Sequence, residues 1–324
     1  PESLPMADLK SKVEDALNEG RILILGGQVI IGAALRLYYF TEFEKLPRAL
    51  RLELTVALGL MLVAIGILLL PAAYHQIVDL GEDTAELHRR STKLMDLTLI
   101  AFAIGLGSYV GICCFNVVGT TGSWIIGLFA FALAIAFWYV APWSAKHHDE
   151  NDTHHKLKQE ESEKRRKQGY VTGIDEKIKT ALIECRMALP GAQALLGFQL
   201  VTFFEPGFQP LPRADKLLHV GSLLAVGIST VFLMAPAAFH RIAEAGENTP
   251  RMYKFTSRML LVAMFFLGLG ICSDFALVLH KVTESYVIAV AIGAGLLAFY
   301  NCLWFAYTAV KRTSSESKLV PQLR

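Results

Sequence analysis

The first half of this 324-residue chain is repeated in its second half without an insertion or a deletion. Residues 12–143 align with residues 177–308 at a constant offset of 165. The matched positions include prolines and histidines, as in residues 71–75 (Pro-Ala-Ala-Tyr-His) and residues 236–240 (Pro-Ala-Ala-Phe-His). Two apolar helix bundles can share a composition, but a shared composition would not keep polar and turn residues in one register. The sequence therefore predicts a tandem duplication, and this repeat restricts the architecture more than any single motif.

Composition and hydropathy predict an all-α integral membrane protein. Hydrophobic residues make up 53% of the chain, and they gather in long blocks. A bilayer core about 30 Å thick needs about 20 helical residues to cross it. Eight segments meet that requirement: 22–40, 51–73, 95–118, 122–143, 187–206, 217–238, 257–281 and 286–309. Because each half contributes an even number of helices, the sequence predicts two parallel four-helix repeats with a pseudo-twofold axis along the membrane normal.

Basic residues outside the predicted spans indicate the orientation of the chain. Of the 31 lysines and arginines, 24 lie in the N-terminal segment, the loops at 74–94 and 239–258, residues 144–186 and the residues after 309. The positive-inside rule then predicts cytoplasmic N- and C-termini. The predicted domains are a first repeat at 1–143, a charged cytoplasmic linker at 144–173, a second repeat at 174–312 and a cytoplasmic tail at 313–324.

Three segments at the predicted cytoplasmic side have a distinctive composition. Residues 9–18 and 174–183 are amphipathic and are expected to lie along the membrane surface before the chain turns inward. The linker carries His147, His148, His154 and His155 among acidic residues. Such a set could hold a divalent metal. Since no second ligand cluster accompanies it, we interpret the linker as a solvated tether and predict no metal site.

Several polar residues recur inside the predicted spans. Gln28 falls on Gln193, and Ser108 falls on Ser273, with Asp274 next to the second serine. A glutamine amide that faced lipid would lack hydrogen-bond partners, so the helix faces that carry these polar residues are expected to face protein. It forms either an interhelical network that stabilises the bundle or the lining of a polar path. A carboxylate near the bilayer makes Asp274 a candidate for handling a proton or a cation.

A second set of polar residues gathers at the predicted cytoplasmic face in both halves. Its members are Glu19, Arg21, His75 and Glu82 in the first half, and Glu184, Arg186, His240 and Glu247 in the second. This ring would coordinate a cation, gate a path by histidine protonation, or tie the helices together by ion pairs. A haem held by His75 and His240 between the halves is a further alternative, although the sequence predicts no cofactor.

Part of the second half carries a family resemblance. The run from Glu184 to Gln193, residues 235–241 (Ala-Pro-Ala-Ala-Phe-His-Arg) and the basic stretch to Arg258 resemble a family of uncharacterised bacterial four-helix membrane proteins. The first half resembles it more loosely, because Leu25 stands opposite Pro190 and Gln76 opposite Arg241. The resemblance implies a bacterial inner-membrane protein made of two fused copies.

The sequence favours a non-enzymatic protein and leaves two classes of function open. It contains no Walker loop, dinucleotide fingerprint, metal-binding helix pair or nucleophile with a base, and its net charge of +2 gives no reason to expect nucleic acid. One class is a channel or transporter for an ion or small solute. The other is a structural or accessory subunit of a larger membrane complex. The expected partners are the lipid bilayer and either further copies of the chain or other membrane subunits.

Overall fold

The computed structural model describes residues 6–81, 85–140, 173–245 and 247–319, and this part of the chain is helical apart from turns and loops. The first half contains α1 (Met6–Leu37), α2 (Thr41–Glu44), α3 (Arg48–Ile77), α4 (Ala85–Cys113), α5 (Phe115–Ile135) and the π-helical turn η1 (Ala136–Val140). The second half contains α8 (Ile174–Thr202), α9 (Arg213–Ile242), α10 (Pro250–Thr283), α11 (Tyr286–Asn301), the π-helical turn η2 (Cys302–Ala306) and α12 (Tyr307–Leu319). The predicted duplication is confirmed at the level of helices.

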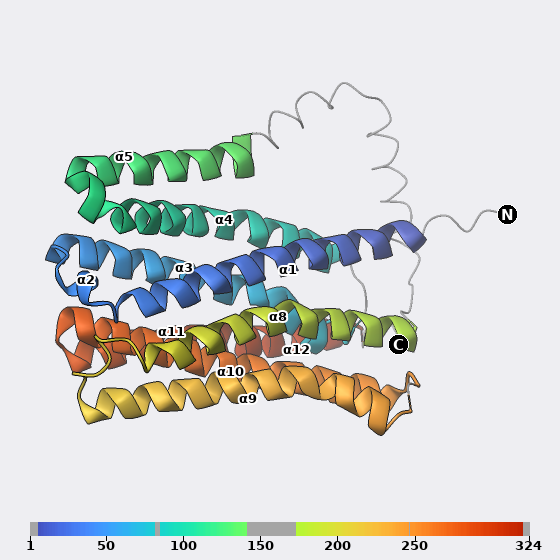
Figure 1. Ribbon diagram of the computed structural model, residues 1–324. Coiled ribbons are helices and arrows are strands. Elements are labelled where there is room, and N and C mark those ends of the chain that lie inside the picture. Colours follow the sequence, from blue (N-terminus) through green and yellow to red (C-terminus); the bar gives the residue numbers. More distant parts are fainter. Residues whose placement is uncertain (1–5, 82–84, 141–172, 246, 320–324) are drawn as a thin grey trace.

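The two halves run in the same direction. Both α1 and α8 begin at one end of the helix array, which we call the terminal end, and finish at the opposite, short-loop end (Figure 1). The backbone repeats its left-handed residues too: Leu80 and Ala245 have φ of 51° and 50°, and Gly119 and Glu284 have φ of 71° and 56°. These are pairs of equivalent positions, so positive φ recurs in the repeat, although the ψ angles of Gly119 (−175°) and Glu284 (22°) differ.

Helix starts follow from local sequence. Pro47 and Pro212 stand immediately before α3 and α9, and proline suits this position because a helix start needs no backbone donor there. Thr249 caps α10 by accepting a hydrogen bond from the Met252 amide at 3.0 Å. Ser285 does the same for α11. Each short loop is thus followed by a helix that runs in the opposite direction.

Seven of the described helical segments are long and apolar enough to cross a membrane. They cover α1, α3, α4, α5 with η1, α9, α10, and α11 with η2 and the start of α12. The sequence predicted eight spans, and α8 is the one that is not among the seven. It is 29 residues long and packs along α1 (Figure 1), but it carries charged residues in its first half and Pro190, Gln193 and Gln199 in its second. These residues lower its hydropathy.

The predicted surface helices are continuous with the long helices. Helix α1 runs unbroken from Met6 to Leu37, and α8 runs unbroken from Ile174 to Thr202. Ile178 and Ala181, on the apolar side of the second amphipathic segment, are buried. The expectation that these segments lie along the membrane surface is therefore wrong for α8, because its apolar side is covered by protein.

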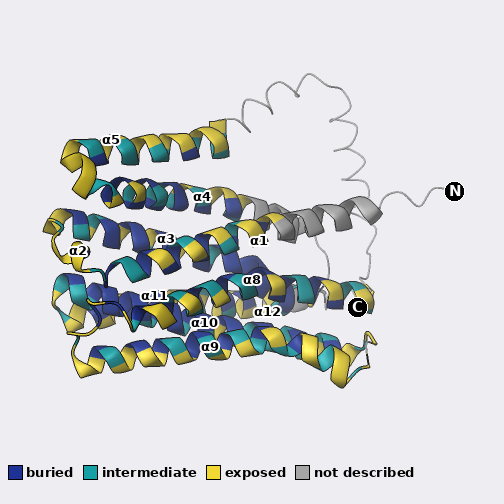
Figure 2. Cartoon of the chain, in the orientation of Figure 1, coloured by how far each residue is buried: buried dark blue, intermediate teal, exposed yellow. Residues whose placement is uncertain are grey.

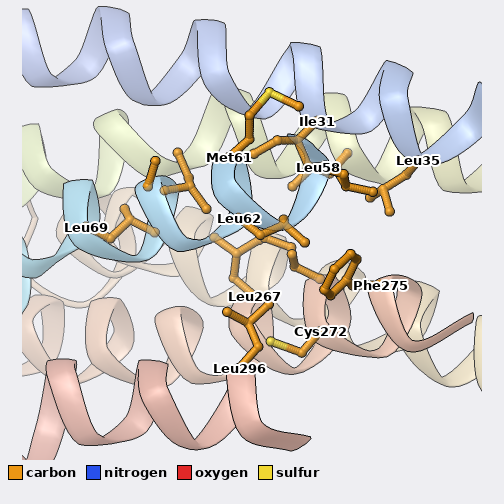
Figure 3. Packing of buried hydrophobic residues seen from close by; sticks show 14 of the residues in the cluster. Ile31, Leu35, Leu58, Met61, Leu62, Leu69, Leu267, Cys272, Phe275 and Leu296 are labelled. Atoms are coloured by element: carbon orange, nitrogen blue, oxygen red, sulfur yellow. The ribbon is translucent and has the colours of Figure 1, made fainter. Parts of the chain in front are cut away.

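The core lies between the two halves. Helix α3 is at the centre of the array and is mostly buried, whereas α5 and α9 lie at opposite edges and expose much of their surface (Figure 2). Figure 3 shows side chains of α3 packed among those of α1, α10 and α11, including Ile31, Leu35, Leu58, Met61, Leu62, Leu69, Leu267, Phe275 and Leu296. Tyr300 and Trp304 insert from the second half and donate to the backbone oxygens of Leu62 and Gly66.

The contacts between the described residues do not follow the predicted pseudo-twofold axis. Such an axis would give equivalent helices equivalent neighbours in the other half. Instead α3 packs against α10, η2 and α12, while its counterpart α9 packs against α8 and α10 of its own half. On the first helices, Gln28 is buried but its counterpart Gln193 is exposed. The halves therefore associate through different faces.

Candidate functional site

The second half holds a buried cluster of four polar side chains near the short-loop end, which we call the histidine–aspartate cluster. Its members are Gln199 on α8, His219 and Ser222 on α9, and Asp274 on α10. His219 Nδ1 lies 3.0 Å from Asp274 Oδ1. Gln199 Nε2 donates to Asp274 Oδ2 at 2.6 Å and to Ser222 Oγ at 2.7 Å. Ser222 Oγ in turn donates to the Gly270 backbone oxygen at 2.8 Å.

The geometry of His219 fits the protonated form of the ring. Its Nδ1 faces the Asp274 carboxylate, and its Nε2 lies 3.1 Å from the backbone oxygen of Gln199. Both neighbours are acceptors. A neutral imidazole donates from one nitrogen, whereas an imidazolium donates from both. The arrangement fits a buried imidazolium paired with a carboxylate, with its two N–H groups directed at the Asp274 side chain on α10 and at the Gln199 backbone oxygen on α8.

Aromatic rings enclose His219 on its short-loop side. The ring centroids of Phe203, Phe208 and Tyr39 lie 4.9, 5.2 and 6.2 Å from that of His219. A cavity of about 10 Å³, the size of about one water molecule, adjoins His219 and Asp274. Burial, with the charges of aspartates nearby, raises the pKa of Tyr39 well above its ordinary value, so its hydroxyl stays protonated.

A second histidine–aspartate pair lies closer to the short-loop end. His280 Nδ1 on α10 is 2.9 Å from Asp215 Oδ2 on α9, and the His280 ring stacks on Tyr286 with centroids 3.7 Å apart. Asp215 precedes His219 by four residues, which is about one helical turn or 6 Å. The two pairs therefore lie one above the other along the α9–α10 interface.

Serines continue this polar face of α9 toward the terminal end. Asp215, His219, Ser222 and Ser229 are spaced so that they share one side of the helix. All four are buried, and Ser229 donates to the backbone oxygen of Ala263 on α10 at 2.8 Å. The buried polar stripe from Asp215 to Ser229 spans about 21 Å of helix.

Contacts between the halves hold the loops that lie on the short-loop side of the cluster. Arg36 pairs with Glu205, and its Nε lies 2.7 Å from Glu205 Oε1. Lys281 lies 3.1 Å from Glu44 and donates to the backbone oxygen of Gly207 at 3.2 Å. Because Arg36 and Glu44 belong to the first half, the covering of the cluster is built by both halves.

A second buried network joins the halves at the terminal end. His75 Nδ1 on α3 lies 2.7 Å from Glu184 Oε1 on α8, and Gln76 Nε2 donates to the other carboxylate oxygen. The side chains of His75 and Glu184 are fully buried. Of the eight residues predicted to form a network at this end, the structure brings these two together. Gln76 was noted in the sequence as a difference between the halves, without a role.

The other described residues predicted for that network are not part of this contact. Glu19, Arg21, Arg186 and Glu247 are exposed, and His240 is half-buried on α9. Glu82 and the histidine-rich linker lie outside the described residues. The predicted ring of Glu, Arg, His and Glu from each half is therefore replaced by one asymmetric contact across the interface, because the two halves meet through different faces.

The predicted in-membrane set is also divided. Gln28 is buried against α8, whereas Gln193 is exposed, so the two glutamines do not form a pair. Ser108 borders an apolar groove of about 180 Å³ between α3, α4 and α5. Ser273 donates to the backbone oxygen of Leu269 in its own helix at 2.8 Å. Asp274 alone among these five belongs to the histidine–aspartate cluster.

Comparison with known proteins gives a family without an assigned activity. A protein family described as "Family of unknown function (DUF6328)" matches twice, at residues 6–142 and at residues 171–308. The chain belongs to this family. The two matches cover both halves, so the chain is a tandem duplication of a single family unit. No curated protein and no solved structure matches it.

Repeated polar positions in the sequence do not predict most of the histidine–aspartate cluster. Its residues are those at which the halves differ: Gln199, His219, Ser222 and Asp274 stand opposite Ala34, Leu54, Ala57 and Tyr109. His219 has Leu54 as its counterpart, so the repeat gives no second histidine at this position. The signal in the sequence was a group of apolar-to-polar differences at one end of three helices.

Proposed function

We propose that this protein is a non-enzymatic membrane transport protein whose second half conducts protons along the α9–α10 interface. The observation that supports the proposal is His219, whose two ring nitrogens both face acceptors beside Asp274 in the buried interface of two long helices. Ionisable side chains are costly within a bilayer and commonly mark ion pathways or proton relays. Imidazole takes up and releases its proton near neutral pH.

The two histidine–aspartate pairs suit a relay. His280 has 16% of its side chain exposed at the short-loop end, and the pair it forms with Asp215 lies one turn from His219. A proton taken up by the outer pair would pass to the inner pair, and the hydroxyls of Ser222 and Ser229 continue the stripe. The rings of Phe203 and Phe208 close the route, so conduction requires their movement.

The proposal includes an orientation and a location. The excess of lysine and arginine at the terminal end supports cytoplasmic chain ends in a bacterial inner membrane. Both histidine–aspartate pairs then lie toward the outer side. Accessibility labelling of cysteines placed in the tail and in the loop before α9 tests this: labelling of both from the same side of sealed cells would contradict it.

Proton flux into proteoliposomes tests the proposed conduction. A pH-sensitive dye is enclosed, and a potassium gradient with valinomycin supplies the driving force. We expect Asp274→Asn to lower the flux at least tenfold relative to wild type. Ser273→Ala is the matched control, since Ser273 adjoins Asp274 but bonds its own helix. Size-exclusion profiles establish that each variant is folded.

Two outcomes would overturn the proposal. One is a wild-type flux equal to that of protein-free liposomes, and the other is a folded Asp274→Asn variant with wild-type flux. Either result would favour the second class of function, a structural or accessory subunit of a larger membrane complex.

A further inference from the structure

The contact between α1 and α8 joins two different faces of one repeated helix. On α1 the contact uses the face of Gln28 and Gly32, and on α8 it uses the face of Gly191 and Phe198. A Cβ atom at Gly191 would clash with the Gln28 side chain, and one at Gly32 would clash with the Phe198 ring. Glycine at both positions therefore permits the close approach of the two helices.

The equivalent faces that this contact does not use are both exposed. Gln28 and Gly32 correspond to Gln193 and Gly197 on α8, while Gly191 and Phe198 correspond to Gly26 and Ala33 on α1. Gln193, Gly197, Gly26 and Ala33 are all exposed, and a Cβ at either Gly26 or Gly197 would meet open space. Each half thus uses one of its two contact faces inside the chain and leaves the other free.

Gln193 separates the exposed face of α8 from an ordinary lipid-facing surface. It lies nine residues before the end of α8 at Thr202, which is about 14 Å along the helix and near the middle of a bilayer. Apolar residues on this face are satisfied by lipid, but a glutamine amide in lipid lacks hydrogen-bond partners. Its counterpart Gln28 is covered by α8, although neither amide atom of Gln28 has a hydrogen-bond partner among the described residues.

The second pair of helices repeats this division. On α3, Gly66 accommodates the Tyr300 ring of the other half, and a Cβ at Gly66 would clash with that ring. The equivalent position on α9 is Val231, which is 67% exposed. The counterpart of Tyr300 is Ile135, half-exposed on α5. The halves therefore differ here by a glycine and a tyrosine in the covered pair and two aliphatic residues in the pair that is not covered.

We propose that a second copy of this chain docks on the outward face of α8 and α9, by the same head-to-tail contact that joins the two halves. The outward face of α1 and α5 on the second copy supplies the other surface. Helices α5 and α9 lie at opposite edges of the helix array (Figure 1). A contact between two different faces repeats from copy to copy, so the assembly closes into a ring or extends as a row in the membrane plane.

The in-chain contacts predict which residues meet between copies. Gln193 of one copy lies against Gly26 of the next, and Gly197 lies against Ala33. A twofold dimer through α8 would instead place Gly197 against its own counterpart in the second copy. Cysteine crosslinking separates these arrangements, because the head-to-tail contact needs two different substitutions.

Crosslinking uses differently tagged full-length chains that carry Gly197→Cys or Ala33→Cys and are expressed together. Both positions are exposed, so neither substitution disturbs the single chain. We expect a disulfide-linked pair of tags that requires both substitutions and exceeds the background of the native cysteines. A linked product from Gly197→Cys alone would overturn the head-to-tail arrangement. So would no linked product although maleimide labels both new cysteines.

The mass of the assembly in lipid nanodiscs gives a second measurement. We expect wild-type protein to form oligomers, and Gly197→Leu to shift at least tenfold more of the protein to monomer at equal concentration. Gly295→Leu is the matched control, since Gly295 is also exposed with open space at its Cβ but lies on α11, away from the proposed faces. Monomeric wild type, or an equal shift in both variants, would overturn the proposal.

Discussion

The α9–α10 pair of the second half and the α3–α4 pair of the first half are equivalent in the repeat, but the residues between the helices differ in polarity. The α9 interior carries Asp215, His219, Ser222 and Ser229, and the equivalent α3 residues are Leu50, Leu54, Ala57 and Ala64. The α3–α4 pair packs mainly through apolar side chains, with a hydrogen bond from the Tyr109 hydroxyl to the Leu54 backbone oxygen, whereas the α9–α10 pair is held by hydrogen bonds and ion pairs.

The difference in interior goes with a difference in position. Helix α3 lies at the centre of the array and packs against both halves, while α9 lies at an edge. A central helix contributes most to the stability of the array when it is apolar on several sides, as α3 is. An edge pair has fewer neighbours, and it is there that polar residues accumulate. After duplication, one copy thus serves as the interior of the molecule, and the other holds the ionisable groups.

The largest expected effect comes from making one residue of the polar interior apolar. His219→Leu leaves the Asp274 carboxylate buried without its cation, and should lower the free energy of unfolding by about 3–5 kcal/mol. Adding Asp274→Tyr installs the pair found in the first half and should recover much of the loss. Thermal unfolding in detergent measures both. A single variant as stable as wild type would show that the buried pair contributes nothing.

The next effect sharpens the comparison at the terminal end. Glu184→Gln weakens charge-assisted hydrogen bonds with His75 and Gln76, and should lower the free energy of unfolding by about 1.5–3 kcal/mol. Its counterpart Glu19 is exposed, so Glu19→Gln should stay within about 0.5 kcal/mol of wild type. Equal effects in the same unfolding assay would contradict the asymmetric contact between the halves.

A smaller effect is expected where the halves exchange large and small residues. Gly66→Val introduces the residue of the second half and forces the Tyr300 ring to move, with an expected loss of about 1–3 kcal/mol. Tyr300→Ile in the same chain should restore part of it. The melting temperatures of the single and double variants provide the test. A double variant whose loss equals the sum of the two single losses would show that the two positions are not coupled.

The smallest effect concerns one hydroxyl of the cluster. Ser222→Ala removes an acceptor for Gln199 Nε2 and a donor to the Gly270 oxygen, and should lower the free energy of unfolding by about 1 kcal/mol. Ser273→Ala should have less effect, because Ser273 bonds the backbone of its own helix. The order of the two melting temperatures decides between a role in the cluster and general helix stability.

Much of the fold was predictable, and the candidate site was predictable in part. Long apolar segments and a register-exact repeat require a duplicated helical membrane protein, because lipid accepts few other structures. Asp274 was predicted from the cost of a carboxylate near the bilayer. Its partners His219 and Gln199 could not be predicted from repeated polar positions, because these two residues occur in the second half alone.

The sequence by itself determined the repeat, the direction of the halves and the apolar helices that cross the array, since these depend on local hydropathy and on chain connectivity. The tertiary structure decided which face of each helix is covered. Gln28 and Gln193 have the same place in their repeats, yet one is buried and the other exposed. The physical reason is that a single chain joins its halves through one contact, and a contact between unlike faces leaves one face of each half unused.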